Sequence, residues 1–528
     1  MFDYIIVGGG SAGCVLANRL SADARVRVGL FEAGPPDDSL LLRIPVGAVA
    51  YVPRKNRRNW AFETVPQAGL NGRRGYQPRG RTLGGSSAIN AMCYIRGHRD
   101  DYDQWAAQGA HGWSFDQVLP YFKRSEHQER GADAFHGQGG PLNVADLRSP
   151  NPLGQVFIAA AEQSGLAKNL DFNGATQEGI GPYQVTQIGG ERCSAARAYL
   201  DPVRARSNLT IETDAQVTAV IFEGLRAVGI RFRRNGVERE LRASREVLLT
   251  AGALQSPQLL MLSGIGPGTA LQALGITVKV DSPSVGANLQ DHIDYTLSYR
   301  SPSRLPIGVS ARGALDLWRA WREFQASRSG RLTTNFAEAG GFIKSEPTLD
   351  RPDLQLFFVV AIVDDHARKL HLGHGFGCHV CLLRPKSRGT LTLASADPLA
   401  APVIDPNFLA EASDLETLVH GFKLVRQILQ AKAFAPYRGR ELYSESVQTD
   451  DEIRAAIRAR ADTVYHPVGT CRMGADPASV VDPALQVRGV TGLRVVDCSV
   501  MPSIVSGNTN APAMMIAEKA ADLILAAG

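Results

Sequence analysis

The chain opens with Phe2-Asp3-Tyr4-Ile5-Ile6-Val7-Gly8-Gly9-Gly10-Ser11-Ala12-Gly13, and this stretch decides the fold. Its apolar first half has the character of a buried strand, and its second half is a GxGxxG turn. Gly8 permits the sharp turn from strand to helix, Gly10 lets a pyrophosphate approach the backbone, and Gly13 allows helix and strand to pack closely. The stretch therefore predicts a dinucleotide-binding unit at the start of the chain.

The residues that follow supply the rest of such a unit. Apolar side chains recur at helical spacing after the turn, and the free amides and dipole at the start of this helix favour phosphate. Val28-Gly29-Leu30-Phe31 then has the pattern of a second strand. Glu32 lies nineteen residues beyond Gly13, close to the spacing of about 20 expected for an acid that binds ribose. This order of elements favours a nucleotide cofactor over an ordinary glycine turn, without distinguishing FAD from NAD.

The composition excludes several classes of protein. At 528 residues the chain is long enough for two domains, and 44% hydrophobic and 21% charged residues are ordinary globular values. The net charge of +5 is small and the arginines are scattered, which argues against a nucleic-acid partner. The densest basic cluster is Arg54-Lys55-Asn56-Arg57-Arg58, which we interpret as a solvated loop in preference to a phosphate or lipid-headgroup patch.

The N-terminal residues, the hydrophobic pattern and the cysteines indicate the cellular compartment in which the protein is expected. Only Met1 precedes the first strand, so we expect no signal peptide, and no run of about 18 apolar residues predicts a transmembrane helix. The seven cysteines form an odd, dispersed set that suits a reducing environment better than a disulfide framework. We therefore expect a cytoplasmic protein, and peripheral contact with the inner face of a membrane stays open.

The distribution of secondary-structure patterns predicts an α/β protein with two domains. β-type runs fall within residues 193–250, strands alternate with amphipathic helices within 296–459, and a strand, loop and helix end the chain. Both termini would then belong to one Rossmann-like cofactor-binding domain, into which an α+β substrate-binding domain is inserted. The expected boundaries are 1–150, 195–295 and 460–528 for the discontinuous cofactor domain, and 151–194 and 296–459 for the substrate domain.

Two clusters imitate metal sites. Asp364, Asp365 and nearby histidines have the chemistry of ligands, but their spacing matches no compact site, and Gly375-Phe376-Gly377 favours a mobile loop. Cys378-His379-Val380-Cys381 has CxxC spacing, yet it continues into a strand, where residues three apart point to opposite faces. We therefore expect no metal. The histidines in question are His366, His371, His374 and His379.

A resemblance to a known family rests on four further motifs. They are GRTLGGSSAIN at 80–90, GALQSPQLL at 252–260, VGANLQDH at 285–292 and YHPVGTCRMG at 465–474. These resemble motifs of the glucose-methanol-choline (GMC) flavoprotein oxidoreductases, and most closely those of the bacterial choline dehydrogenase and aliphatic alcohol dehydrogenase branch. The chain has no second dinucleotide motif, so we expect one cofactor to exchange electrons directly with substrate and acceptor.

The resemblance implies FAD as the cofactor. Some family members tether FAD through a histidine beside the asparagine of the 80–90 motif, whereas this chain has Ile89 there, so we expect non-covalent FAD. The pyrophosphate is expected at the first turn, the ribose at Glu32, and the adenine near Val217. The expected cofactor contacts are Gly8, Gly10, Ser11, Ala12, Gly13, Glu32, Ala33, Leu83, Gly84, Asn90, Ala91, Met92, Val217, Tyr465, Asp497 and Ala511.

The resemblance also implies a catalytic pair, His466 and Asn510. An imidazole whose ordinary pKa is about 6.5 suits the base that accepts the proton of an alcohol while hydride leaves for the flavin N5. Asn510 would orient the substrate oxygen, although Asn508 is a rival cap for the same C-terminal helix.

Three further residues concern the substrate. Glu338 resembles a carboxylate that faces the trimethylammonium group in choline-acting members, but related enzymes for uncharged alcohols share its surroundings. Trp60 and Tyr465 would be aromatic groups around a cation or simple pocket walls. These residues therefore leave the substrate undecided.

We expect FAD-dependent oxidation of primary alcohols to aldehydes, with electrons passed to a quinone or another carrier in preference to oxygen. Within the family, the rivals are a choline dehydrogenase and an oxidase that uses oxygen on aryl or furan alcohols. Outside this chemistry, the rivals are a light-driven fatty acid decarboxylase and a flavoprotein without enzymatic activity. The presence of both His466 and Asn510 argues against the photochemical alternative.

Overall fold

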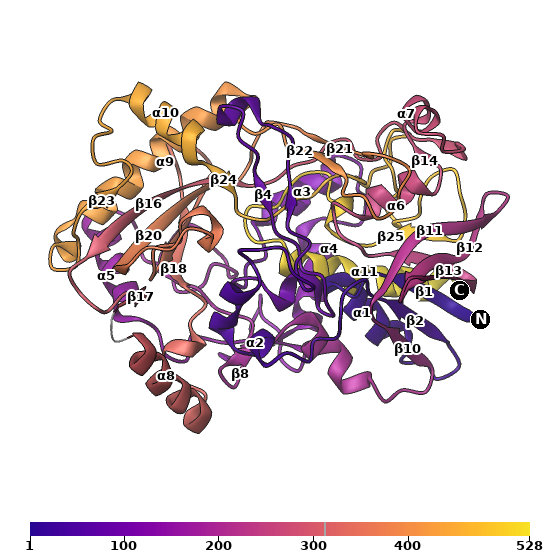
Figure 1. The fold of residues 1–528 in the computed structure, drawn as a ribbon, viewed down its shortest axis with the longest axis horizontal. Coiled ribbons are helices and arrows are strands. Elements are labelled where there is room, and N and C mark those ends of the chain that lie inside the picture. Colours follow the sequence, from indigo (N-terminus) through magenta and orange to yellow (C-terminus); the bar gives the residue numbers. More distant parts are fainter. Residues whose placement is uncertain (311–312, 528) are drawn as a thin grey trace.

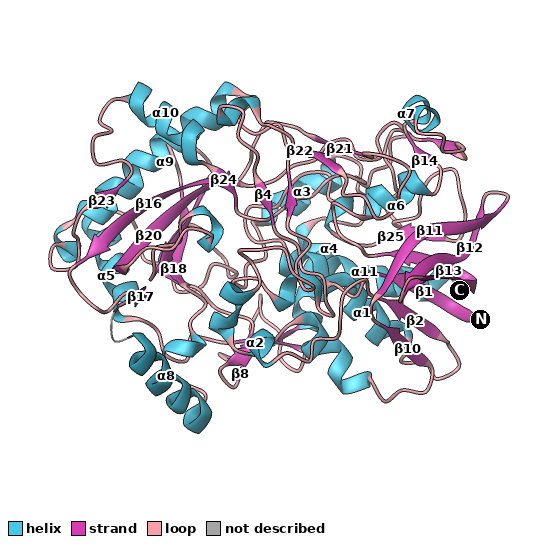
Figure 2. Cartoon of the chain, in the orientation of Figure 1, coloured by secondary structure: helices cyan, strands magenta, loops and turns pink. Residues whose placement is uncertain are grey.

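The computed structural model describes residues 1–310 and 313–527, and its fold is α/β, as the sequence predicts. Figure 1 shows a sheet at each end of the molecule, with helices and long loops between them. Both chain ends lie beside the sheet on the right, so the chain leaves this sheet and later returns to it. Figure 2 shows that loops and short helices fill the space between the two sheets.

The first sheet contains the predicted dinucleotide unit. Its central strand, β1, is parallel to β2 on one side and to β13 on the other. β13 also pairs in parallel with β25 near the C-terminus and in antiparallel fashion with β12. The described strands of this sheet are β1 (Phe2–Val7), β2 (Val28–Phe31), β10 (Leu209–Glu212), β11 (Ala215–Glu223), β12 (Arg226–Arg234), β13 (Val237–Leu249) and β25 (Leu493–Val495).

Helices cover this sheet because their apolar faces need a partner. α1 (Ser11–Leu20) follows the glycine turn, and its predicted apolar residues Ala12, Val15, Leu16 and Leu20 are all buried. α11 (Asn510–Ala527) packs against α1 and against α4 (Phe115–Ser125), and it is buried along most of its length. This packing brings the start of the C-terminal helix to the predicted cofactor turn.

The second sheet is largely antiparallel and is covered by α5 (Pro152–Gln163) and α9 (Ala412–Gln430), while α10 (Asp450–Arg460) packs on α9. Phe358, Phe376 and Phe434 form part of the core between the sheet and these helices. The described strands are β7 (Gly179–Pro182), β16 (Ile293–Ser301), β17 (Gly308–Val309), β18 (Ala337–Ile343), β19 (Leu354–Val359), β20 (Gly373–Leu382), β23 (Glu441–Leu442) and β24 (Asp462–Thr463).

The remaining elements connect or flank the two sheets. The short strand pairs are β3 (Phe62–Glu63) with β4 (Tyr76–Gln77), β5 (Glu126–Gln128) with β6 (Leu142–Val144), β8 (Gln187–Ile188) with β9 (Glu191–Arg192), β14 (Ile265–Gly266) with β15 (Val280–Asp281), and β21 (Thr390–Thr392) with β22 (Val403–Asp405). The other helices are α2 (Leu40–Arg43), α3 (Arg99–Ala107), α6 (Ser256–Leu262), α7 (Gly268–Ala273) and α8 (Gly313–Ser327).

One predicted loop is a strand. Gly375-Phe376-Gly377 favoured a mobile loop, but all three residues lie inside β20. A Cβ atom on Gly375 would lie 2.3 Å from the carbonyl oxygen of Tyr299 and 2.6 Å from the side chain of Ile362. This glycine therefore allows close packing within the sheet, a role that glycine also has in strands.

No helix in the described part of the chain combines the length and the apolarity needed to cross a bilayer.

Candidate active site

One cavity, of about 400 Å³, brings most of the predicted site residues together. It extends from the glycine turn after β1 to the loop that contains His466. The predicted residues that line it are Gly8, Gly10, Ser11, Ala12, Glu32, Ala33, Trp60, Asn90, Ala91, Met92, Val217, Tyr465, His466, Asp497 and Asn510. The predicted residues that do not line it are Gly13, Leu83, Gly84, Glu338 and Ala511.

The glycine turn has the geometry of a phosphate cradle. A Cβ on Gly13 would lie 1.9 Å from the carbonyl oxygen of Gly8, so only glycine allows this contact between helix and strand. Gly10 faces the cavity, and a Cβ there would have no atom closer than 4.0 Å, which leaves room for a ligand against the backbone. A second turn supports the first, because the Gly84 amide donates to the Gly9 carbonyl at 2.7 Å.

Glu32 is buried at the end of β2 and retains capacity for ribose. Its carboxylate accepts hydrogen bonds from the amides of Gly9 at 2.8 Å and Gly34 at 2.7 Å. Burial raises its pKa to about 7, against the opposing effect of these two bonds. A carboxylate has about four acceptor positions, so two remain for hydroxyl groups of a ligand.

Trp60 lies toward this end of the cavity. Its ring stacks on Phe62 at 5.6 Å, and the guanidinium group of Arg81 lies 4.5 Å from the ring centre. Arg81 is close enough to Glu32 to oppose the rise of its pKa. Trp60 is therefore a wall residue whose cation position is already taken by Arg81.

Asp497 lines the cavity and lies two residues after β25. It accepts hydrogen bonds from the hydroxyl of Ser256 at 2.6 Å and from the amides of Gly252 at 2.9 Å and Ser499 at 2.8 Å. Ile89, which also lines the cavity, has no atom able to bond covalently to a flavin. The glycine cradle, the acid after β2 and this wall together fit a non-covalently bound FAD.

His466 is held in place from its backbone. Its amide donates to Asp291 at 2.8 Å, and the other carboxylate oxygen of Asp291 accepts from Thr463 at 2.6 Å and Gln77 at 2.9 Å. Burial raises the pKa of Asp291 to about 6, against the opposing effect of these hydrogen bonds. The preceding residue, Tyr465, has a positive φ of 76°, so the loop bends sharply at this point.

The hydrogen bonds of His292 determine which nitrogen of His466 can accept a proton. Nε2 of His292 lies 3.0 Å from the carbonyl oxygen of Leu383, so this nitrogen must donate. Burial lowers the pKa of His292 to about 4, so its ring is neutral at pH 7 and its Nδ1 accepts. Nδ1 of His466, at 3.0 Å, must therefore donate, which leaves a lone pair on its Nε2.

The asparagines complete this arrangement. The amide nitrogen of Asn508 donates to Nε2 of His466 at 3.2 Å, in agreement with a lone pair there. Gln355 donates to the carbonyl oxygen of Asn508 at 3.2 Å, which fixes the orientation of its amide. Asn510, the first residue of α11, accepts from the hydroxyl of Ser11 at 2.7 Å. Both asparagines line the cavity, but Asn508 is the one in contact with His466.

Glu338 lies outside the cavity wall. Its carboxylate accepts hydrogen bonds from Thr334 at 2.5 Å and from the amide of Asn151 at 2.5 Å. The pairing of β18 with β19 has a β-bulge between Ala337 and Ala339, and at this bulge Ala337 lines the cavity while Glu338 does not. Glu338 is therefore not among the residues that would face a ligand in this cavity.

The side chains of the two clusters that resemble metal sites form hydrogen bonds and ion pairs with other residues. Asp364 accepts from Arg460, Tyr443 and His371 at 2.6 to 2.8 Å, and His379 contacts Asp294 and Thr296. Across residues 1–310 and 313–527, no group of three or more potential ligands is close enough to hold a metal.

The structure adds two residues to those that sequence reasoning assigned. Asp291 and His292 end the VGANLQDH motif, and Figure 1 places β16, which follows them, in the sheet far from the glycine turn. The motif was a signal for these residues, but their role depends on contacts with His466, which is 174 residues away from His292. Asn508 was considered only as a helix cap, and its contact with His466 was not expected.

Comparisons with known proteins agree with this site. Family models described as GMC oxidoreductase match residues 2–294 and 385–517. The chain is 50% identical to an alcohol dehydrogenase (acceptor) of Pseudomonas putida, over 99% of this chain and 96% of that protein. It is 45% identical to the mitochondrial choline dehydrogenase of Homo sapiens, over 99% and 89%.

Solved structures lead to the same family. A pyridoxine 4-oxidase from Mesorbium loti superposes with a TM-score of 0.89 and is 32% identical, covering 99% of each chain. A formate oxidase superposes with a TM-score of 0.92 and is 28% identical, covering 100% of this chain and 98% of the other. This chain therefore belongs to the GMC oxidoreductase family and is an FAD-dependent enzyme that acts on CH–OH groups.

Proposed function

We propose that this enzyme oxidises uncharged primary alcohols to aldehydes, with His466 as the base and with a quinone or another carrier as the electron acceptor. The observation that carries the proposal is the lone pair that His292 imposes on Nε2 of His466 at the cavity wall. FAD, when bound, supplies the two-electron acceptor for the hydride of the carbinol carbon.

His466 is suited to take the hydroxyl proton at neutral pH. Burial, together with the nearby His292 and Arg79, lowers its pKa well below the ordinary value, so the ring is unprotonated before the substrate binds. On binding, the substrate hydroxyl would replace the Asn508 amide at Nε2, which would accept the hydroxyl proton as the bond between carbon and hydrogen breaks. Asn508 and Asn510 both line the cavity and would donate hydrogen bonds that orient the substrate oxygen.

The contacts of Glu338 favour an uncharged substrate. Choline carries a fixed positive charge, which a buried site accommodates best with a facing carboxylate or aromatic groups. Glu338 does not line the cavity, and Arg81 already covers Trp60. The similarity to the alcohol dehydrogenase (acceptor) supports the same choice and an acceptor other than oxygen.

The experiment is anaerobic reduction of the flavin in the purified protein, followed by the loss of its visible absorbance. Short and long primary alcohols are compared with choline, in the wild type, in His466→Ala and in His420→Ala. His420 lies on α9 beside Glu346 and is the matched control. We expect reduction by uncharged alcohols, a loss of about 10²- to 10⁴-fold in His466→Ala, and no change in the control.

Other outcomes would redirect the assignment. Reduction by choline alone would make the enzyme a choline dehydrogenase, despite the orientation of Glu338. Rapid reoxidation by air with peroxide formation would make it an oxidase. No reduction in the dark by any alcohol would remove the hydride mechanism and favour the photochemical or non-enzymatic alternatives.

A further inference from the structure

Exposed apolar side chains are concentrated on three segments of the described chain, which we call the apolar rim. The segments are α2 with the turn that follows it, β17 with α8, and the loop 365–372. Nine of the seventeen large apolar residues that are strongly exposed belong to these segments, each between 42 and 72% accessible. They are Leu40, Leu41, Val49, Val309, Leu315, Leu317, Trp318, Leu370 and Leu372.

The three segments of the rim are in contact with one another. The inner face of α8 packs through Ala320 and Phe324 on Ile44, directly after α2. Figure 1 shows α8 at the lower edge of the molecule, near α2. Val309 pairs with Leu372, which joins β17 to the loop 365–372. The exposed residues therefore form one surface.

The cavity of the candidate active site opens within this rim. Val49 both lines the cavity and is 48% exposed, so the cavity reaches the surface beside it. Val52 lines the wall on the same side, and Val363 and His366 line it at the base of the loop 365–372. Tyr76 connects these parts, because its hydroxyl donates to the Val52 carbonyl at 2.7 Å and its ring lies 5.3 Å from that of His366.

The rim and the adjoining residues 51–58 are also basic. Residues 40–58, 315–324 and 365–372 contain nine lysines and arginines and three carboxylates, a surplus of six positive charges. Ion pairs with Asp38, Asp214 and Asp364, which lie outside these ranges, offset part of this surplus. On α8 the guanidinium group of Arg322 lies 5.4 Å from the ring centre of Trp318. Leucine and tryptophan next to arginine and lysine is the composition of elements that bind at a lipid surface.

We propose that the apolar rim docks on the surface of an anionic lipid bilayer and holds the cavity mouth against it. The leucines and Trp318 would enter the boundary between headgroups and acyl chains, while the lysines and arginines would contact lipid phosphates. The Arg54–Arg58 cluster, interpreted from sequence as a solvated loop, becomes part of this basic border. A second copy of the chain is a poorer occupant, because a two-fold contact would place this positive surface against itself.

This docking does not depend on the proposed function, but it would serve it. An acceptor dissolved in the bilayer, such as a quinone, would reach the cavity through the mouth between Val49 and the loop 365–372. A long-chain alcohol would have the same short route.

The test is flotation of the FAD-loaded protein with lipid vesicles. Vesicles of phosphatidylcholine alone are compared with vesicles that also contain phosphatidylglycerol, at low and high salt. We expect binding to the anionic vesicles, weakened by salt. The double variant Leu317→Ser/Trp318→Ser should lower the bound-to-free ratio about tenfold or more, because it removes two large apolar contacts.

A matched control distinguishes this surface from general stickiness. Leu225 and Val237, at the β11–β12 turn and the start of β13, are 53 and 54% exposed, similar to Leu317 and Trp318 at 62 and 54%. Leu225→Ser/Val237→Ser should bind vesicles like the wild type. No binding to anionic vesicles, or equal losses in both double variants, would overturn the proposal.

Two further readouts close the remaining alternatives. If the wild type is an oligomer that Leu317→Ser/Trp318→Ser dissociates, the rim is an interface between copies and the proposal fails. Flavin reduction by alcohols without lipid is measured on the same samples. If alcohols do not reduce the flavin, the proposed function is contradicted. The vesicle experiment then still tests, by itself, whether the rim binds lipid.

Discussion

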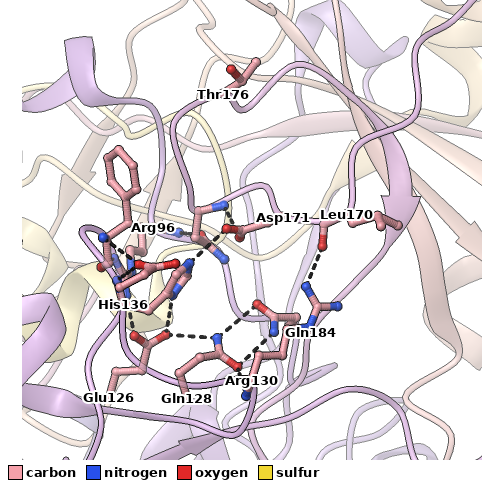
Figure 3. A network of polar contacts seen from close by, with 12 residues as sticks. Arg96, Glu126, Gln128, Arg130, His136, Leu170, Asp171, Thr176 and Gln184 are labelled. Carbon is pink, nitrogen blue, oxygen red and sulfur yellow. Dashed lines mark hydrogen bonds and ion pairs between the residues drawn. The ribbon is translucent and has the colours of Figure 1, made fainter.

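The pKa values of two buried histidines, His466 and His136, are shifted in opposite directions. Nδ1 of His466 contacts another neutral histidine, His292, and burial lowers the pKa of His466 well below the ordinary value. Figure 3 shows His136 between two carboxylates, with Nε2 2.9 Å from Asp171 and Nδ1 3.3 Å from Glu126. Burial also lowers the pKa of His136, but these two bonds outweigh it and raise the pKa to about 9.

The comparison shows that the partner of a buried histidine decides its use. A neutral partner keeps His466 free to accept a proton, which a base requires. Two carboxylates make His136 a permanent cation at pH 7, and Arg96 pairs with the far side of Glu126 at 2.7 Å. Figure 3 also shows Gln128 and Gln184 bonded beside this group. This network joins the 94–97 segment to two neighbouring loops, so its role is structural.

The largest effect is expected from removing the charge of His136. His136→Gln leaves Asp171 without its cationic partner and should lower the free energy of unfolding by about 3 kcal/mol. This is at the low end for a buried pair, because Arg96 still pairs with Glu126 and Asp171 is 32% exposed. Urea-induced unfolding measures the change, and the rate of flavin reduction per bound FAD should stay at the wild-type value.

A second variant separates charge from packing. His136→Gln together with Asp171→Asn removes both members of the pair, so part of the lost stability should return. Wild-type stability in His136→Gln would contradict the structural role. If flavin reduction slowed in that variant by as large a factor as in His466→Ala, the two histidines could no longer be assigned different roles.

The next effect concerns the partner of His466. His292→Leu removes the acceptor for Nδ1–H of His466 and leaves a buried donor unpaired, at a cost of about 1–3 kcal/mol. The ring can then carry its hydrogen on Nε2, so flavin reduction at saturating alcohol should slow by about 10- to 100-fold.

Rescue tests whether His292 acts through the tautomer of His466. Gln in place of His292 offers a carbonyl oxygen to Nδ1–H, so His292→Gln should recover part of the rate that His292→Leu loses, with little change in KM. Equal rates in His292→Leu and the wild type would show that the tautomer does not matter.

The sequence predicted the fold and most of the cavity wall because these features depend on local rules. The glycine turn and the spacing to Glu32 are set within one βαβ unit, and the structure confirms the α/β fold built around it. The domain boundaries and the roles of the individual site residues stay predictions. Gly375 shows the limit of local reasoning, since glycine indicates a loop unless a neighbouring segment, here Ile362, requires the space.

Contacts between segments that are distant in the sequence could not be predicted from it. The orientation of Glu338 depends on which face of β18 meets the cavity, and a carboxylate beside a run of small residues is compatible with either face. The pairing of His292 with His466 depends on the return of the chain from the second sheet. A motif can mark such residues, but the hydrogen bonds that give them a chemical role belong to the tertiary structure.

The smallest effect is the pH dependence of stability, in which the two histidines should act on opposite sides of pH 6.5. A raised pKa means that the folded protein holds a proton that the unfolded chain releases, so the contribution of His136 is full below about 6.5 and is lost as the pH rises toward 9. Between pH 6.5 and 7.5 this loss amounts to about 1 kcal/mol. The lowered pKa of His466 has the opposite sign, because the unfolded chain binds a proton that the folded protein excludes, and stability falls below pH 6.5.

Urea unfolding at a series of pH values separates these two contributions. Subtracting the curve of His136→Gln from that of the wild type cancels the other titrating groups and isolates the contribution of His136. The difference should shrink steadily from pH 6.5 to pH 9, while both proteins lose stability equally on the acid side. A difference that stays constant with pH would mean that His136 is neutral in the folded protein, and the contrast with His466 would then be one of packing and not of charge.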